Sequence, residues 1–239
     1  MTGLAATLAA WAIVASDPAA VLGKVDAAAS RAKDAILSLE LSVSTRDSDP
    51  LQRTIRIWQA GAERRLVKFV APAKLRGTGV LSVDGQTYLY LPAYEKVRRV
   101  VGRDGGGSFL GTGFSVRDLA RTRFSRDYTP SLVSEDAAHV VLKLVPKDPE
   151  AHEHAWLIVT VRLADDLVER IETLDAAGAR MRTLTADQFE TLDGYVVARH
   201  VVIEETESGR RTEARLTGAE FDTGLGDAMF TERELRRAP

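Results

Sequence analysis

The sequence predicts a mainly β protein built on one large, strongly curved antiparallel sheet or incomplete barrel of about ten or eleven strands. Three observations lead to this fold class. Segments in which apolar and polar residues alternate recur along the chain, turn signals separate them, and helical spacing occurs only near the N-terminus and inside one long loop. Because strands joined by short turns form meanders, we expect consecutive strands to be neighbours in the sheet.

Residues 1–16 are predicted to be a signal peptide. The apolar run from Leu4 to Ala15 covers about a dozen residues, whereas a membrane-spanning helix needs roughly 20. Small residues before Asp17 and Pro18 are typical of a cleavage region. The first basic residue is Lys24, so the usual positive start is missing. Either the true start lies upstream, or the segment is a buried or frayed terminal helix.

Residues 17–239 are expected to form a single domain. The chain has 239 residues, of which 45% are hydrophobic and 28% charged, a composition that allows a sizeable core. The formal net charge of −2 provides no global positive field for nucleic acid. The absence of cysteine excludes disulfides, thiolate nucleophiles and cysteine metal sites.

Helical spacing begins at Pro18, with Asp17 as a cap, and continues to about Lys33 before the period changes to two. The Asp84-Gly85 pair is typical of a tight hairpin. Residues 86–91 are apolar on both faces, which indicates a strand that is buried on both sides or borders a cavity. The expected strands cover residues 37–43, 54–58, 65–70, 79–83, 86–91, 140–145, 156–163, 167–174, 180–186, 195–205 and 210–221.

Residues 92–128 are expected to be a long loop, because they are rich in glycine and show little alternation. A short helix is predicted at residues 116–120. The glycines at 102–113 do not indicate a phosphate site, because neither the Gly-Lys-Ser/Thr end of a P-loop nor a βαβ unit accompanies them.

No motif predicts catalysis. The sequence His152-Glu153-His154 could present two imidazoles to one ion, but no third ligand is evident, and we interpret it as a solvated loop. His139 and His200 are interpreted as surface or interface residues, since no nucleophile or acid partner is evident. No nucleophile elbow or Ser/His/Asp arrangement occurs either. We therefore expect no enzyme activity, no cofactor and no metal.

A basic stretch lies within the long loop. It contains eight cations from Lys96 to Arg126, including Arg121, against four acids from Glu95 to Asp127. One interpretation is a solvated face that salt bridges partly neutralise. The other is a patch near the mouth of a cavity that meets lipid headgroups or an acidic partner. The sequence leaves both open.

Several ordered motifs resemble the outer membrane lipoprotein-sorting protein family, which is similar to the LolA and LolB lipoprotein carriers. They lie between about residues 69 and 128, and the order of the other elements is compatible over the rest of the chain. One departure is that Thr112 and Gly113 precede Phe114 where the family usually has an acidic residue, so the loop is expected to be more flexible here. The motifs are Pro72-Ala73-Lys74-Leu75-Arg76-Gly77-Thr78, Leu89-Tyr90-Leu91-Pro92, Lys96-Val97-Arg98-Arg99-Val100, Ser108-Phe109-Leu110-Gly111-Thr112-Gly113-Phe114-Ser115 and Asp118-Leu119.

The resemblance implies a curved antiparallel half-barrel with an N-terminal helix and short lid helices, whose concave apolar face accepts acyl chains. It implies a periplasmic carrier of lipids or lipoproteins, involved in outer membrane lipoprotein sorting or lipid transport and associated with the outer membrane. An RND-type inner-membrane exporter or an outer-membrane acceptor is the expected partner, and we expect a monomer. The alternative is an accessory envelope protein that docks an exporter and binds no lipid, and an enzyme is the third possibility.

Strand alternation selects the residues expected to line the acyl-chain cavity, although a register error of one would exchange the faces. They are Leu39, Leu41, Ile55, Ile57, Phe69, Tyr90, Leu157, Val159 and Val161. Phe109, Leu110 and Phe114 are expected to belong to a movable lid, residues 92–128, because an inert exposed loop would not need such apolar side chains. The motif residues are expected to shape loops or contact a partner, with the structural role favoured for the first four: Arg76, Gly77, Thr78, Pro92, Arg98, Arg99 and Asp118.

Overall fold

The structure is a computed structural model that describes residues 16–46, 48–120 and 123–239. The expected signal peptide, apart from its last residue, and Arg121 of the basic stretch lie outside the described residues. In the described part of the chain, no helix is both long and apolar enough to cross a membrane.

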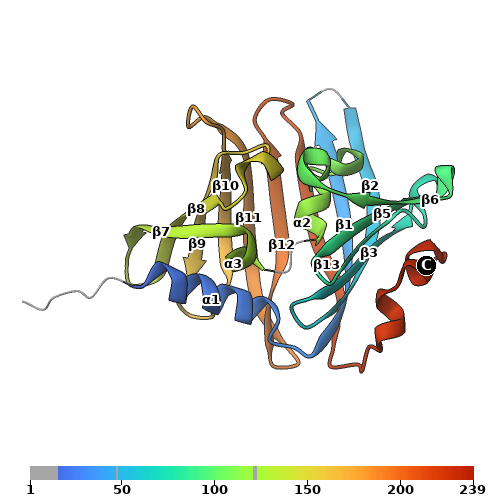
Figure 1. Ribbon diagram of the computed structural model, residues 1–239, viewed down its shortest axis with the longest axis horizontal. Helices are drawn as coiled ribbons and strands as arrows, with labels where there is room; N and C mark the ends of the chain where they lie inside the picture. Colours follow the sequence, from blue (N-terminus) through green and yellow to red (C-terminus); the bar gives the residue numbers. More distant parts are fainter. Residues whose placement is uncertain (1–15, 47, 121–122) are drawn as a thin grey trace, which may run out of the picture.

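The strands form one antiparallel sheet of 13 strands that curves around the helices in Figure 1. Their order is β6-β5-β4-β3-β2-β1-β13-β12-β11-β10-β9-β8-β7. The strands are β1 (Asp34–Thr45), β2 (Ser48–Ala60), β3 (Arg64–Ala71), β4 (Gly79–Val83), β5 (Gln86–Leu91), β6 (Lys96–Val100), β7 (Tyr128–Glu135), β8 (His139–Pro146), β9 (Trp156–Arg162), β10 (Val168–Leu174), β11 (Arg180–Leu192), β12 (Tyr195–Glu205) and β13 (Arg211–Phe221). The predicted curved, mainly β architecture is confirmed.

Helices are short apart from the first. The α-helices are α1 (Pro18–Ala29), α2 (Val116–Ala120), α3 (Phe124–Asp127) and α4 (Glu232–Arg236). The 3-10 helices are η1 (Ala73–Leu75), η2 (Pro92–Tyr94), η3 (Gly102–Gly105), η4 (Phe109–Gly111), η5 (Pro149–Ala151) and η6 (Asp227–Phe230). Asp17 caps α1 by accepting a hydrogen bond from the amide of Ala19 at 3.1 Å.

β6 lies inside the predicted loop, and β7 lies almost entirely between that loop and the next expected strand, where no element was predicted, so the count of ten or eleven strands was too low. β6 has two exposed arginines and little alternation, but the ladder to β5 pairs one side of its backbone. β7 contains Pro130, which an edge strand tolerates because one side of its backbone is unpaired. Since β6 belongs to the sheet, the expectation that all of residues 92–128 form a lid apart from the sheet was wrong for residues 96–100.

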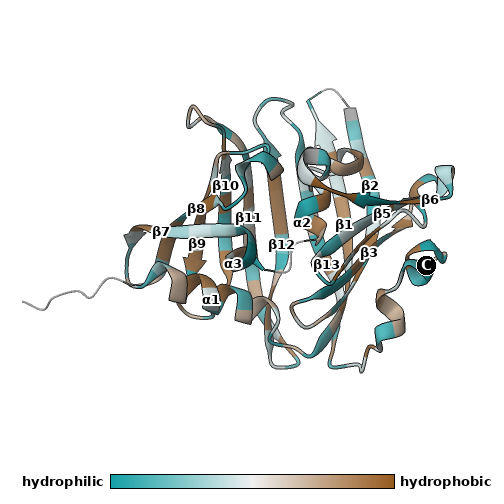
Figure 2. Ribbon diagram, viewed as in Figure 1, coloured by the Kyte–Doolittle hydropathy of each residue, from teal (hydrophilic) through white to brown (hydrophobic). Residues whose placement is uncertain are grey.

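Strands β1 and β13 come from opposite ends of the domain's sequence and pair with each other in the middle of the sheet. Leu41 of β1 is opposite Ala214 of β13, and both are buried on the face that carries α1 and α2. We call this the inner face, and its opposite the outer face. In Figure 2 the strands behind the helices are apolar over much of their length, whereas the edge strand β7 is paler.

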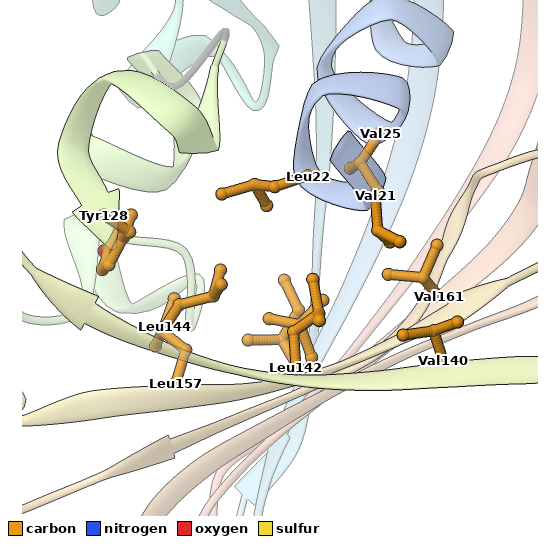
Figure 3. Packing of buried hydrophobic residues seen from close by; sticks show 11 residues of the cluster. Val21, Leu22, Val25, Tyr128, Val140, Leu142, Leu144, Leu157 and Val161 are labelled. Carbon is orange, nitrogen blue, oxygen red and sulfur yellow. The ribbon is translucent and has the colours of Figure 1, made fainter. Parts of the chain in front are cut away.

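Two apolar clusters occupy the inner face. In the first, α1 packs on β7 to β10, and Figure 3 shows Val21 and Leu22 directed toward Leu142 and Leu144 of β8. In the second, α2 and the loop before it pack on β1 to β4 and β13. The two clusters leave space between them, and this space positions the site described below.

The C-terminal segment, residues 225–239, covers the outer face of β3, β4 and β5. Leu235 and Phe230 are buried there against Leu66 and Leu81. Lys68, only 1% exposed, donates hydrogen bonds from Nζ to the carbonyls of Glu234 and Arg237, both at 2.5 Å. The chain therefore supplies its own cover for one half of the outer face.

Candidate functional site

An apolar cavity of about 300 Å³ lies on the inner face between the two clusters. Helix α1, the start of α3 and strands β9 to β11 contribute most of its wall. A second cavity of about 270 Å³ shares Ala29, Arg65 and Leu167 with it, so the two adjoin. The first is lined by Val25, Asp26, Ala29, Arg65, Phe114, Asp118, Phe124, Leu157, Asp166, Leu167, Val168, Ile171, Arg182 and Leu184. We call these two spaces the inner cavity.

A larger cleft of about 680 Å³ opens at one end of the sheet. Four segments form it: residues 106–118, the β8–β9 connection at 151–154, the β10–β11 hairpin at 173–182 and the β12–β13 hairpin at 205–208. Most of its charged side chains come from these turns. Asp118 and Arg182 line both this cleft and the inner cavity, so they stand at the boundary between them.

The boundary is an ion pair that little water reaches. Arg182 Nη1 lies 2.6 Å from Asp118 Oδ2, and the side chains are 19% and 12% exposed. The same nitrogen donates to the carbonyl of Gly113 at 2.8 Å. Burial opposes the charge of the guanidinium, but the adjacent Asp118 carboxylate outweighs it and raises the pKa of Arg182. Because separating a buried pair leaves a charge without compensation, this contact fastens α2 to β11.

Ser115 and Asp118 position the boundary by capping α2. Asp118 Oδ2 accepts hydrogen bonds from the Ser115 amide at 2.9 Å and its hydroxyl at 2.8 Å, while the Asp118 amide donates to Ser115 Oγ at 3.0 Å. Gly113, with φ of +73°, lies against the sheet, where a Cβ would come within 3.1 Å of Ile203. The glycine in place of the family's acidic residue therefore allows this loop to approach the sheet closely.

The imidazole rings of His152 and His154 line one side of the cleft, with Tyr128 behind them. Tyr128 Oη lies 3.0 Å from His154 Nε2 and 3.4 Å from His152 Nδ1. His152 is only 5% exposed, so the interpretation of residues 152–154 as a solvated loop was wrong for this side chain. It packs on Tyr128, whose ring no local pattern placed nearby. Within the described ranges, no three His, Asp or Glu side chains are arranged to hold a metal ion.

The residues predicted to line the cavity separate into three groups. The second inner-face cluster, under α2 and η4, contains five of them: Leu39, Leu41, Ile55, Ile57 and Phe69. The lid residues Phe109, Leu110 and Phe114 pack on the same cluster. Leu157, Val159 and Val161 belong to the cluster under α1, and Leu157 lines the inner cavity. Tyr90 lies instead in the outer-face cluster under the C-terminal segment.

The placement of Tyr90 corrects the prediction for β5. In the β4–β5 pairing, Tyr90 is opposite Gly79, and the preceding residue, Leu89, is opposite Val80. Val80 belongs to the second inner-face cluster. Leu89 therefore faces inward and Tyr90 outward. Alternation alone could not decide between the two faces because both are covered.

Several residues of the inner cavity were missed by sequence reasoning. Leu184, Ile171 and Val168 continue the apolar rows of β9 across β10 and β11, and this alternation was the available signal. Arg182 had no such signal, because its partner Asp118 lies 64 residues away. Val25 and Phe124 come from helices whose position over the sheet no local pattern indicates.

The motif residues mainly shape connections. Gly77 has φ of +85°, and a Cβ there would lie 3.3 Å from Pro92 Cγ. Thr78 is buried, and Arg76 donates to the carbonyl of Pro239 at 3.0 Å. Asp118 differs from these because it lines the site, whereas Arg98 and Arg99 are exposed on the edge strand β6 and reach no part of it.

Three solved structures share this architecture. A domain from Vibrio parahaemolyticus, described as an outer membrane lipoprotein-sorting protein domain, is 24% identical, with a TM-score of 0.81 over 92% of this chain and 98% of its own. A LolA superfamily protein from Nitrosomonas europaea is 19% identical, with a TM-score of 0.75 over 92% and 100%. A DUF1329 family protein from Desulfovibrio piger is 22% identical, with a TM-score of 0.79 over the same shares.

A protein-family model described as that of an uncharacterized protein matches residues 61–237. The comparison with curated proteins gave no match. The predicted resemblance to lipoprotein-sorting proteins is thus confirmed. At identities of 19% to 24%, what the solved structures show of this chain is its fold.

Proposed function

Because the chain belongs to the family whose model spans residues 61–237 and has the fold of the LolA superfamily, we propose that it is a carrier that holds acyl chains of a lipid or lipoprotein in the inner cavity. The carrier performs no covalent chemistry. The observation that carries the proposal is the apolar inner cavity, which adjoins a charged cleft across the Asp118–Arg182 pair.

The dimensions of the cavity suit this role. Ligand sites in proteins are commonly about 300–1,000 Å³, and the inner cavity falls in this range. Burial of an acyl chain contributes about 0.8 kcal/mol per methylene, so a chain of moderate length binds usefully without any catalytic group. Leu157, Ile171 and Leu184 supply the apolar surface for it.

We place the carrier in the periplasm, associated with the outer membrane, where it exchanges cargo with an RND-type exporter or an outer-membrane acceptor. Support comes from the apolar run at residues 4–15 and from the lipoprotein-sorting description of the Vibrio parahaemolyticus domain. It acts as a monomer.

Filling the inner cavity tests the proposal. Leu184→Trp places an indole in the cavity wall, whereas Val133→Trp adds the same group at an exposed site, 54% accessible, on β7. We expect lipid to co-purify with the wild-type chain and with Val133→Trp, as native mass spectrometry would detect, and Leu184→Trp to lose it while remaining folded. Wild-type protein that carries no lipid and ignores a fluorescent fatty acid would overturn the proposal.

A second candidate function is the accessory protein that docks an exporter. The edge strand β6 favours it, since Arg98 and Arg99 are exposed there and Tyr94, in the turn that precedes this strand, is 71% exposed. Charge reversal of both arginines would abolish exporter capture in this case and leave any lipid binding intact. Unchanged capture would exclude docking through this edge.

A further inference from the structure

The inner face changes from apolar to polar within two residues along three adjacent strands. Ile171, Leu184 and Ile203 are cross-strand neighbours on β10, β11 and β12. Two residues along each strand, Thr173 and Arg182 are neighbours, and Arg182 is opposite Glu205. Two residues correspond to about 7 Å of strand. Ile171 and Leu184 of the first row line the inner cavity, and the second row lines the cleft. An amphiphile changes from acyl chain to headgroup over a comparable distance.

Thr173 indicates that the cleft is built for a polar ligand. The residue is only 7% exposed and lines the cleft, and its Oγ1 has no hydrogen-bond partner among the described residues. A buried hydroxyl without a partner is unfavourable, so natural structures rarely keep one. An ester or phosphate oxygen of a ligand whose chain occupies the inner cavity would accept this hydrogen bond.

The charges around the cleft favour a headgroup that carries an ammonium. Five carboxylates line it against three guanidinium groups, so its formal charge is negative: Asp118, Glu153, Asp175, Glu205 and Glu207 against Arg117, Arg180 and Arg182. Such an excess repels an anionic headgroup and attracts a cationic group.

Several of these charges already have partners. Arg182 pairs with Asp118, and Arg180 pairs with Glu172 at 2.8 Å. Glu205 pairs with Arg210 at 2.7 Å. Glu207 is exposed and forms no ion pair with any residue in the described part of the chain, so its carboxylate is available to a ligand.

We propose that the cleft is a headgroup site for a lipid with a zwitterionic phosphate–ammonium headgroup. The ammonium lies at Glu207, the ester oxygens at Thr173, and the acyl chains extend past the Asp118–Arg182 pair into the inner cavity. This inference rests on the proposed carrier function and adds the class of lipid that is carried. The inference predicts that the protein distinguishes this lipid from anionic lipids that have the same acyl chains.

The test compares two lipids with identical chains. Delipidated protein is offered vesicles of equimolar dioleoyl phosphatidylethanolamine and dioleoyl phosphatidylglycerol, and the bound lipids are quantified by mass spectrometry. We expect the ethanolamine lipid to be enriched by about tenfold, which corresponds to about 1.4 kcal/mol. Equal uptake, or preference for the glycerol lipid, overturns the headgroup inference and leaves the carrier function intact. Uptake of neither lipid contradicts the carrier function itself.

Variants locate the site. Glu207→Gln should reduce the enrichment several-fold, whereas Glu40→Gln, an exposed change on β1, should not. Thr173→Val should weaken binding of the ethanolamine lipid without lowering the melting temperature, because the hydroxyl has no partner in the empty protein. If Thr173→Val lowers stability and leaves binding unchanged, the hydroxyl has a structural role and the inference is wrong.

A soluble competitor distinguishes a lipid from a free headgroup. We expect glycerophosphoethanolamine, which has the same phosphodiester headgroup but no acyl chain, to compete at least about a hundredfold more weakly than the lipid, because it gains nothing from the inner cavity. Competition at equal concentration would show that the cleft binds a soluble zwitterion, which overturns the assignment to a lipid.

Discussion

The two halves of the sheet are buried in different ways. In β3 and β4, runs of four consecutive residues are buried, so both faces are covered. In β8 and β9 burial alternates residue by residue, and only the inner face is covered, by α1. Continuous burial is typical of strands covered on both faces, and alternation of strands with one solvated face.

The C-terminal segment accounts for the difference. It covers the outer face of β3 to β5, where Lys68 is buried and its pKa is lowered, primarily by burial. Lys68 caps the end of α4 by donating to the carbonyl of Glu234 in the helix and to that of Arg237, the residue after it. Among the described residues, no comparable segment covers the outer face of β8 and β9, where Lys143 Nζ lies 4.0 Å from the centre of the Trp156 ring. The N-terminal half therefore depends on residues from the other end of the chain.

The largest expected effect comes from loosening this cover. Leu235→Ala removes a fully buried side chain that touches β4, so we expect it to lower the free energy of unfolding by about 3 kcal/mol. Leu51→Ala, at a leucine 51% exposed on β2, should cost less than about 0.5 kcal/mol. Chemical denaturation measures both. Equal effects would show that the segment adds nothing to the core.

The next effect concerns the start of the C-terminal segment. Asp34 of β1 accepts hydrogen bonds from Thr223 and from the amides of Gly224 and Leu225, at 2.7 to 3.2 Å. Burial opposes the charge, but these donors outweigh it and lower the pKa of Asp34. The unfolded chain therefore binds the proton more readily, and the stabilisation is complete above the unfolded pKa, about 3.9, and is lost as pH falls through the folded value.

Asp34→Asn should accordingly destabilise the protein by about 2 kcal/mol at pH 7, because an amide supplies fewer acceptors than a carboxylate. Its free energy of unfolding should also depend less on pH below about 5. Denaturation curves between pH 7 and pH 3 test this. If the free energies of unfolding of the wild type and Asp34→Asn fall in parallel on acidification, protonation of Asp34 does not weaken the attachment of the C-terminal segment.

A smaller effect is expected in the lid. Phe109, Leu110 and Phe114 pack on the inner face. Besides local contacts, their loop is held by two arginines: Arg53 donates to the carbonyl of Leu110 at 2.5 Å, and Arg182 donates to that of Gly113 at 2.8 Å. We expect the amides of residues 108–114 to exchange faster than those of β5 and to slow by about tenfold when lipid is added. Protection equal to that of residues 87–91, with no response to lipid, would identify the loop as a fixed wall.

The smallest effect is expected for an ion pair in the solvated half. Arg199 Nη1 lies 3.2 Å from Glu190 Oε1, with side chains 36% and 46% exposed. Glu190→Ala should change the free energy of unfolding by less than about 0.5 kcal/mol, because water screens such a pair. A loss comparable to that of Leu235→Ala would mean that this half also depends on contacts at its surface.

Prediction from the sequence succeeded best in the half with one solvated face. The expected strand at residues 140–145 is one residue shorter than β8 at each end, and the one at 156–163 is one residue longer than β9 at its end, because water on one side imposes alternation. The short helix expected at residues 116–120 coincides with α2. The apolar faces of residues 86–91 indicated burial on both sides or a cavity, and both faces of β5 are packed. The edge strands β6 and β7 were missed because exposed strands need no apolar pattern.

By itself the sequence determined the fold class, the first helix and most strands, since periodicity and turn chemistry act over a few residues. Only the tertiary structure decided that β1 pairs with β13, that Tyr90 faces outward, and that Asp118 meets Arg182. These contacts join segments far apart in the chain, and they depend on sheet register and on which segment covers which face. Local patterns carry neither, because a shift of one residue exchanges the faces of a strand without changing its alternation.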